Sequence, residues 1–132
     1  MFAIGGAQAV KALVPLLATA SKGVISEVAG SCVRCAERYL AEGKTADAVK
    51  LYDTVRKAKV PKQRVREATR GAILARGTAG LPLLLEQLRS TDKAMFTIGL
   101  STAREVPGRE ATEAVAAEVG RASANRQTQL IM

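Results

Sequence analysis

One short pattern recurs along the chain and constrains the fold more than any other feature. Residues 6–17 read GAQAVKALVPLL, residues 77–88 read GTAGLPLLLEQL and residues 108–119 read GREATEAVAAEV, while a slipped copy opens at Gly43. The opening glycines at positions 6, 43, 77 and 108 are 37, 34 and 31 residues apart. A period of this length is typical of solenoids that stack helix pairs.

In the three clear copies, the fourth, seventh and eleventh residues after the glycine fall on one helical face. These residues are Val10, Leu13 and Leu17, then Leu81, Leu84 and Leu88, then Thr112, Val115 and Val119. Because each face starts directly after a turn residue, each copy predicts a helix that opens a repeat.

Helical periodicity and turn residues predict an all-α chain without strands. We expect helices over residues 7–18, 22–41, 45–58, 61–76, 81–89, 93–105 and 109–120, then a frayed segment over 125–132. Pro61 suits the first helical position, and Ser90, Thr91 or Asp92 suits an N-cap. The prediction is one α-solenoid domain over residues 1–132, with about four antiparallel helix pairs. Its repeats are expected at residues 1–42, 43–76, 77–106 and 107–132.

The composition agrees with stacked helices. Hydrophobic residues make up 48% of the chain but aromatic residues only 3%, so small aliphatic side chains would let helices approach closely. No apolar run reaches the roughly 18 to 20 residues that span a bilayer, and the first residues lack the pattern of a secretion signal. We therefore expect a soluble, cytoplasmic protein without a membrane partner.

The ends of the sequence are apolar, with Phe2-Ala3-Ile4 at the start and Leu130-Ile131-Met132 at the finish. Terminal repeats of a solenoid normally present a polar outer face. Two interpretations remain open: the chain is a piece of a longer solenoid, or its ends associate with another copy.

Several stretches resemble bacterial HEAT repeats of the phycobilisome-lyase type. Residues 4–17 have the glycine-rich turn and the Ala-Val-x-x-Leu helix of such repeats, and residues 27–36 (EVAGSCVRCA) match the second helix. Residues 65–68 (VREA) match the start of a second helix, and residues 41–52 (AEGKTADAVKLY) are similar to a tetratricopeptide first helix. The resemblance implies an armadillo-like α-solenoid that binds other proteins.

Positive charge is concentrated in one segment. Ten Lys and Arg against three Asp and Glu between residues 44 and 76 carry +7 of the formal +8. Lys62, Arg66 and Arg70 recur at every fourth residue, so they would form one stripe along a helix, with Arg56 and Lys59 in the preceding turn. We call these five residues the basic stripe.

The basic stripe allows three interpretations. It could be a solvated face that keeps an Ala-rich array soluble, a binding surface for an acidic protein, or a non-specific nucleic-acid surface. Stacking on single-stranded nucleic acid is disfavoured, because the only aromatic residues are Phe2, Tyr39, Tyr52 and Phe96, and the last three fall on faces predicted to be buried.

Residues suited to catalysis are few. The chain has no His, which excludes Ser-His and Cys-His devices. Cys32 and Cys35 form a CxxC inside a predicted helix, without the further ligands of a zinc site or the preceding strand of a thioredoxin site. We interpret them as small apolar side chains of the core and predict no catalytic residues, metal or cofactor.

The sequence thus predicts a non-catalytic protein interaction scaffold that uses the concave helical surface of the solenoid. The alternatives are non-specific nucleic-acid binding through residues 56–70, or a purely structural spacer that associates through its ends.

Overall fold

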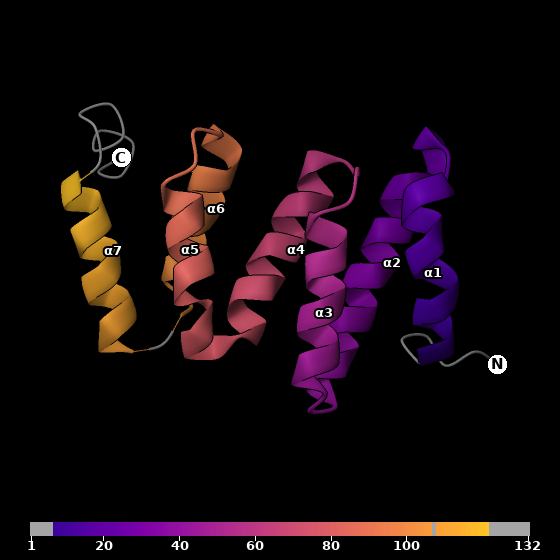
Figure 1. Ribbon diagram of the computed structural model, residues 1–132, viewed down its shortest axis with the longest axis horizontal. Helices are drawn as coiled ribbons and strands as arrows, with labels where there is room; N and C mark the ends of the chain where they lie inside the picture. Colours follow the sequence, from indigo (N-terminus) through magenta and orange to yellow (C-terminus); the bar gives the residue numbers. More distant parts are fainter. Residues whose placement is uncertain (1–6, 107, 122–132) are drawn as a thin grey trace.

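All secondary-structure elements are helices in the part that the structure, a computed structural model, describes, namely residues 7–106 and 108–121. Its elements are α1 (Ala7–Thr19), α2 (Lys22–Ala41), α3 (Thr45–Arg56), α4 (Lys62–Ala75), the 3-10 helix η1 (Gly77–Gly80), α5 (Leu81–Leu88), α6 (Lys93–Ala103) and α7 (Arg109–Arg121) (Figure 1). Gly6, both apolar terminal segments and the frayed segment predicted at 125–132 lie outside the described residues. The last predicted repeat is therefore described only through α7.

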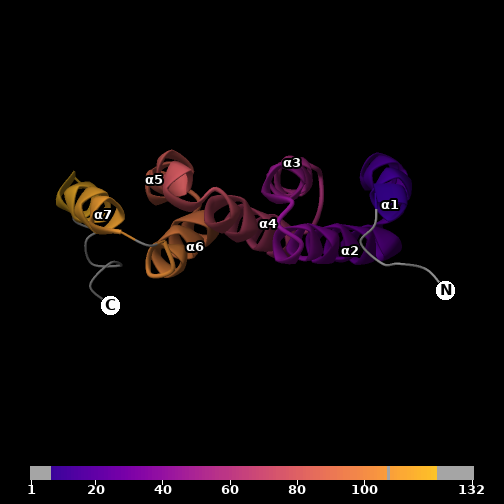
Figure 2. The same cartoon turned by 90° about the horizontal axis from the view of Figure 1, so that it is seen from below.

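The first six helices alternate between two layers. Seen along the helices, α1, α3 and α5 form one layer, and α2, α4 and α6 form the other (Figure 2). Consecutive helices pack against each other, and α4 also contacts both α2 and α6 within its own layer. Beyond them, α7 packs on α5 and α6. Two surfaces result, which we call the odd-helix face and the even-helix face.

The glycines that open the predicted repeats have an unusual backbone. Gly43, Gly77 and Gly108 have φ of 79°, 59° and 105°, and they are the only positive-φ residues in the described ranges. A side chain is rarely tolerated at such angles, so glycine is the residue suited to these turns. The recurring glycine therefore marks positions where the chain must reverse direction between helices.

The helix bounds agree with the sequence prediction for α2 and differ slightly elsewhere. The prediction for Pro61 was wrong by one residue: it precedes the helix with ψ of 146°, and α4 begins at Lys62. The η1 turn was not predicted. Its last residue, Gly80, lies so close to α4 that an added Cβ would be 2.2 Å from the carbonyl oxygen of Ile73, which forces a tight path there.

The larger core belongs to the first four helices. It is built from small and medium apolar side chains, with two tyrosines. Its buried members are Leu17, Ile25, Val28, Ala29, Cys32, Val33, Cys35, Ala36, Tyr39, Ala48, Leu51, Tyr52, Val55, Ala68, Ala72 and Ala75. The prediction that Cys32 and Cys35 are core residues is confirmed, because both are fully buried.

A smaller apolar cluster joins the end of α4 to α5 and α7. Its buried members are Ile73, Leu84, Val106 and Ala111. The predicted face of α7 was wrong in one respect, because Thr112 is exposed and Ala111 is buried in its place. The Thr112 hydroxyl donates to the carbonyl oxygen of Gly108 at 3.5 Å, so a one-residue rotation of the face leaves this polar group outside the core.

Candidate functional site

The α4 part of the basic stripe faces α6. At one end, Lys62 Nζ lies 2.9 Å from Oδ2 of Asp92, the N-cap residue of α6. Two turns further along α4, Arg70 donates through two guanidinium nitrogens to Glu105, just beyond α6, with Nε 2.9 Å from Oε2. Two stripe residues therefore hold α6 against α4.

Both ion pairs leave an electrostatic signature. The hydrogen bond from Lys62, followed by that from the Ala94 amide, lowers the pKa of Asp92 below its ordinary value. The hydrogen bond to Glu105 raises the pKa of Arg70. Each cation is engaged by a carboxylate of the same chain, so neither Lys62 nor Arg70 is fully available to a partner.

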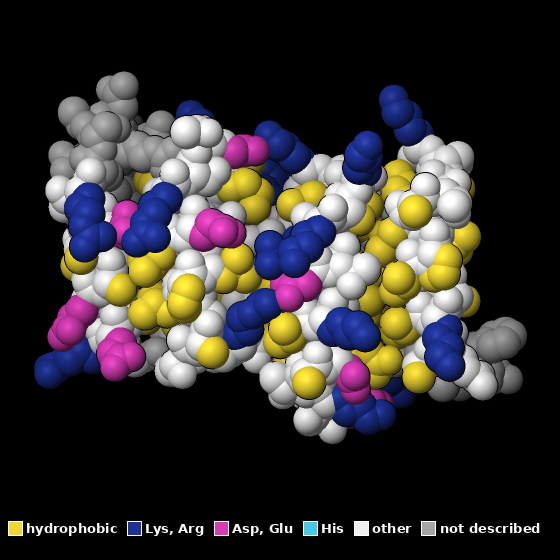
Figure 3. Space-filling view, in the orientation of Figure 1, with side chains coloured by type: hydrophobic (Ala, Val, Ile, Leu, Met, Phe, Trp, Pro, Cys, Tyr) yellow, Lys and Arg dark blue, Asp and Glu magenta, His cyan; other side chains and the backbone are white. Residues whose placement is uncertain are grey.

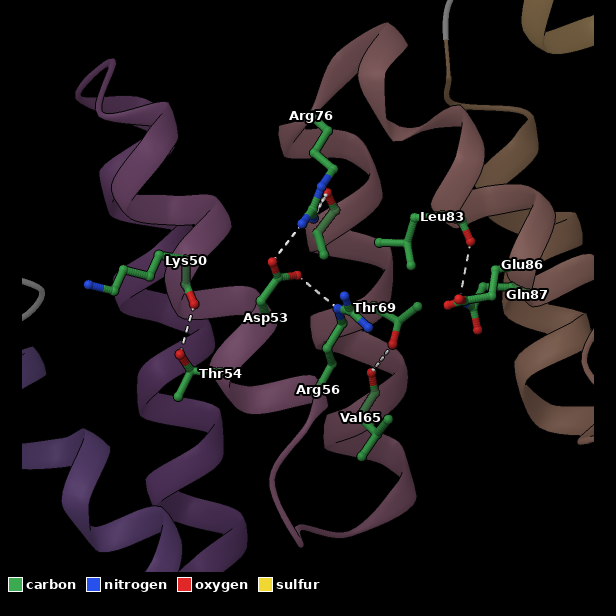
Figure 4. Close-up of polar contacts among 11 residues, drawn as sticks. Lys50, Asp53, Thr54, Arg56, Val65, Thr69, Arg76, Leu83, Glu86 and Gln87 are labelled. Atoms are coloured by element: carbon green, nitrogen blue, oxygen red, sulfur yellow. Dashed lines mark hydrogen bonds and ion pairs between the residues drawn. The ribbon is translucent and has the colours of Figure 1, made fainter.

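Arg56 is also engaged within the chain. Asp53 of α3 lies between two guanidinium groups, with Oδ1 2.8 Å from Arg56 Nε and Oδ2 2.5 Å from Arg76 (Figure 4). Burial alone would raise the pKa of Asp53, but the hydrogen bonds from Arg76 and Arg56 outweigh it and lower that pKa. This cluster ties α3 to the end of α4 and belongs to the fold.

Lys59 lies apart from the rest of the stripe. It is exposed and borders an apolar groove of the odd-helix layer, where hydrophobic side chains are visible between α1 and α3 (Figure 3). The groove is lined by Val14, Leu17, Ala18, Ala20, Lys22, Ile25, Thr54, Ala58 and Lys59. Among the five predicted stripe residues, the structure thus groups only the three on α4.

Arg66 occupies the middle of the α4 part of the stripe and differs from its neighbours. It is half-buried and has no hydrogen bond or ion pair with any described residue. It lines an open groove between α4 and α6, together with Lys62, Asp92, Lys93, Ala94, Thr97 and Ile98. We call this the α4–α6 groove. Its lining combines three cations, one carboxylate and an apolar floor of Ala94 and Ile98.

Lys93 also lines the groove, although it is not part of the basic stripe predicted from the sequence. It follows the N-cap residue Asp92 and is exposed at the mouth of the groove. Its position in the first turn of a helix, where a cation opposes the helix dipole, was the available signal. A charge that is unfavourable locally can be retained for an interaction elsewhere.

The described residues offer little for chemistry. They contain no group of three or more His, Cys, Asp or Glu residues able to hold a metal ion. Burial, followed by the charge of Cys35, raises the pKa of the Cys32 thiol to about 11, so Cys32 is a weak nucleophile at neutral pH. Over the same residues, none of the helices combines the length and hydrophobicity that crossing a bilayer requires.

Comparison with known proteins gives no match to any protein-family model, curated protein or solved structure.

Proposed function

We propose that the protein is a non-catalytic interaction scaffold of HEAT-like helix pairs, which binds an acidic segment of a protein partner in the α4–α6 groove. The alternating layers and the recurring glycine turns support a solenoid architecture. In such an array, consecutive helices of one layer leave grooves between them that suit an extended chain.

The observation that carries the proposal is the position of Arg66. The cations one turn before and after it are held by Asp92 and Glu105, whereas Arg66 forms no ion pair or hydrogen bond with a described residue. Arg66 lines the groove without a carboxylate partner, so its guanidinium donors are available to a ligand there. A carboxylate from a partner would supply the missing interaction, in the bidentate geometry that arginine favours.

The groove has further features that suit an acidic segment. Lys62 and Lys93 flank Arg66, so the cations outnumber the single carboxylate of Asp92. The floor of Ala94 and Ile98 accepts apolar side chains between the acidic ones. Apolar contacts would supply affinity, and the cations would set the preference for charge and the rate of association.

The test is a binding titration with a fluorescein-labelled peptide rich in Glu and Leu. Arg66→Glu is expected to weaken binding by roughly tenfold or more, because it places like charges together. Lys57→Glu is the matched control, since it makes the same charge change at an exposed position outside the groove. Changing Lys62 or Arg70 is less informative, because each also breaks a contact between α4 and α6.

Equal weakening by Arg66→Glu and Lys57→Glu would reject the groove and leave only a general effect of charge. A random DNA duplex that binds more tightly than the peptide, and that loses affinity in Arg66→Glu, would assign the groove to nucleic acid instead. Such binding would fall steeply with salt.

A further inference from the structure

A second recess opens on the even-helix face, between α2 and α4. It has a volume of about 290 Å³. Its lining residues come from α2, α3 and α4 and are Gly30, Val33, Arg34, Glu37, Tyr52, Arg64, Glu67, Arg70 and Gly71. We call it the Tyr52 recess, because a side chain from the other layer reaches into it.

Tyr52 crosses from one layer to the other. It belongs to α3, yet its ring lies against Gly71 of α4, where an added Cβ would be 2.2 Å from the ring. Only 3% of Tyr52 is exposed. Glycine inside a helix destabilises it by about 0.5–1 kcal/mol relative to alanine. Gly71 is nevertheless required here, because any side chain would overlap the Tyr52 ring.

The Tyr52 hydroxyl has no hydrogen-bond partner among the described residues. Within those residues, Thr102 Oγ1 is the only fully enclosed side-chain nitrogen or oxygen without a partner. The Tyr52 hydroxyl must therefore be reached by solvent, and the recess that Tyr52 lines is where it opens. Burial, followed by the charge of Glu37, raises the pKa of Tyr52 to about 12, so the hydroxyl remains a donor.

Two of the arginines that line the recess, Arg64 and Arg70, already have partners within the chain. Arg64 donates to Ser26 at 3.1 Å and to Glu67 at 2.9 Å, and its guanidinium lies over Gly30. Arg70 is held by Glu105. These pairs shape the recess but leave little charge for a ligand.

Two other charged side chains that line the recess, Arg34 and Glu37, remain available to a ligand. Arg34 has only the Ser31 hydroxyl as a partner, at 3.1 Å, and Glu37 has no partner among the described residues. The recess therefore presents a hydroxyl donor, a guanidinium donor and a carboxylate acceptor around one small space.

We propose that the Tyr52 recess binds a neutral carboxamide, the side chain of an Asn or Gln in the bound segment. The amide oxygen accepts from the Tyr52 hydroxyl and Arg34, and the amide NH₂ donates to Glu37. A carboxylate in the same place would face Glu37, and an ammonium would face Arg34. The proposal rests on the proposed function, since the amide is assigned to the same partner segment.

The two binding features are close enough for one extended segment. Arg70 borders the recess and Arg66 lines the α4–α6 groove, and these residues are four positions apart, about 6 Å along α4. An extended chain advances by about 3.3–3.6 Å per residue, so an amide and an acidic side chain a few residues apart can reach both features.

The experiment titrates the ¹⁵N-labelled protein with N-acetylglutamine methylamide and follows the Gly30 and Gly71 amide signals by NMR. We expect saturable shifts of both signals, and a loss of affinity of roughly threefold or more in Tyr52→Phe, which removes one hydrogen bond. Tyr39→Phe is the matched control, because Tyr39 is also buried but does not line the recess. It should bind the probe like the unchanged protein.

Arg66→Glu distinguishes this proposal from the proposed function. It should weaken the acidic peptide without altering the response to the amide probe. If the protein binds the amide probe but not the acidic peptide, the proposed function of the α4–α6 groove is rejected. If it binds the peptide but not the amide probe, the proposal for the Tyr52 recess is rejected. The recess proposal is overturned if the glutamate analogue of the probe binds as well as the amide, if Tyr52→Phe has no effect, or if Gly30 and Gly71 do not respond.

Discussion

The first four helices and the last three are held together differently. Between α1 and α4 a continuous apolar core includes Tyr39, Leu51 and Val55, and the one buried polar side chain, Thr69, donates to the carbonyl oxygen of Val65 at 2.7 Å. The apolar cluster that joins α5 and α7 to α4 is much smaller. The region of the last three helices also buries two polar residues, Gln87 of α5 and Thr102 of α6.

Ion pairs supplement the smaller core without replacing it. Lys62–Asp92 and Arg70–Glu105 attach α6 to α4, and Arg89 of the α5 C-cap pairs with Glu118 of α7 at 2.7 Å. Exposed ion pairs contribute only about 0–1 kcal/mol each, far less than buried leucines. The difference predicts that α5–α7 is the less stable region, and that it opens before α1–α4.

Matched leucine deletions are expected to have the largest effect on this comparison. Leu84→Ala and Leu51→Ala remove the same atoms from buried sites in the two regions, and each should cost about 2–5 kcal/mol. Hydrogen exchange should show lost protection confined to α5–α7 in Leu84→Ala, whereas Leu51→Ala should affect all helices. Uniform loss of protection in both variants would show that the two regions unfold as one unit.

Glycine replacement tests the packing of the first region. Gly71→Ala should destabilise the protein by about 1–3 kcal/mol in urea unfolding, because the new Cβ overlaps the Tyr52 ring. Gly23→Ala is the control, since nothing lies within 4 Å of a Cβ there and alanine is the better helix former. It should raise stability by about 0.5–1 kcal/mol. If Gly71→Ala left the free energy of unfolding unchanged, the Tyr52 ring could not be packed against Gly71 of the other layer.

A pair of Thr→Val variants tests the buried polar groups. Thr102→Val removes a buried hydroxyl without a partner, so the free energy of unfolding should rise by about 1 kcal/mol. Thr69→Val removes a hydroxyl that is satisfied by the Val65 carbonyl oxygen (Figure 4), so it should bring no gain. An equal increase in the free energy of unfolding in both variants would show that the unpaired Thr102 hydroxyl does not destabilise the last three helices.

The smallest effect is expected at Glu118, whose side chain is 10% exposed. The hydrogen bond from Arg89 lowers the pKa of Glu118 below 4.5, so its contribution to stability is present above that pH and is lost as the pH falls through the folded-state pKa. Glu118→Gln should cost about 0.5 kcal/mol near neutral pH. The difference between the variant and the unchanged protein should disappear in acid, and a constant difference would contradict an electrostatic origin.

The sequence predicted elements whose signals are local. Helix α2 was placed correctly from its spacing of apolar residues, and the N-cap at Asp92 is confirmed by its 2.9 Å contact with the Ala94 amide. The glycines at 43, 77 and 108 were recognisable because the turn they make depends on the residue itself. Local rules fix these features without information from the rest of the chain.

Contacts between distant residues could not be predicted in the same way. Regular spacing showed that Lys62, Arg66 and Arg70 share a helix face. It could not show that Lys62 pairs with Asp92, 30 residues further along, or that Arg70 pairs with Glu105, 35 residues further along. The Tyr52 recess was also missed. Its one local signal was Gly71 inside an otherwise favourable helix, which indicates close approach by a neighbour but not by which one.

The repeat-opening turns depend on the handedness of the residue at their glycine positions. At Gly43, Gly77 and Gly108 no atom lies within 4 Å of an added Cβ, so backbone handedness and not space excludes a side chain there. A D-alanine prefers a positive φ, so it would adopt the backbone of these three turns without the conformational strain that L-alanine has there. A chemically synthesised chain with D-alanine at these positions would lose the flexibility of glycine in the unfolded state and keep every helix in place.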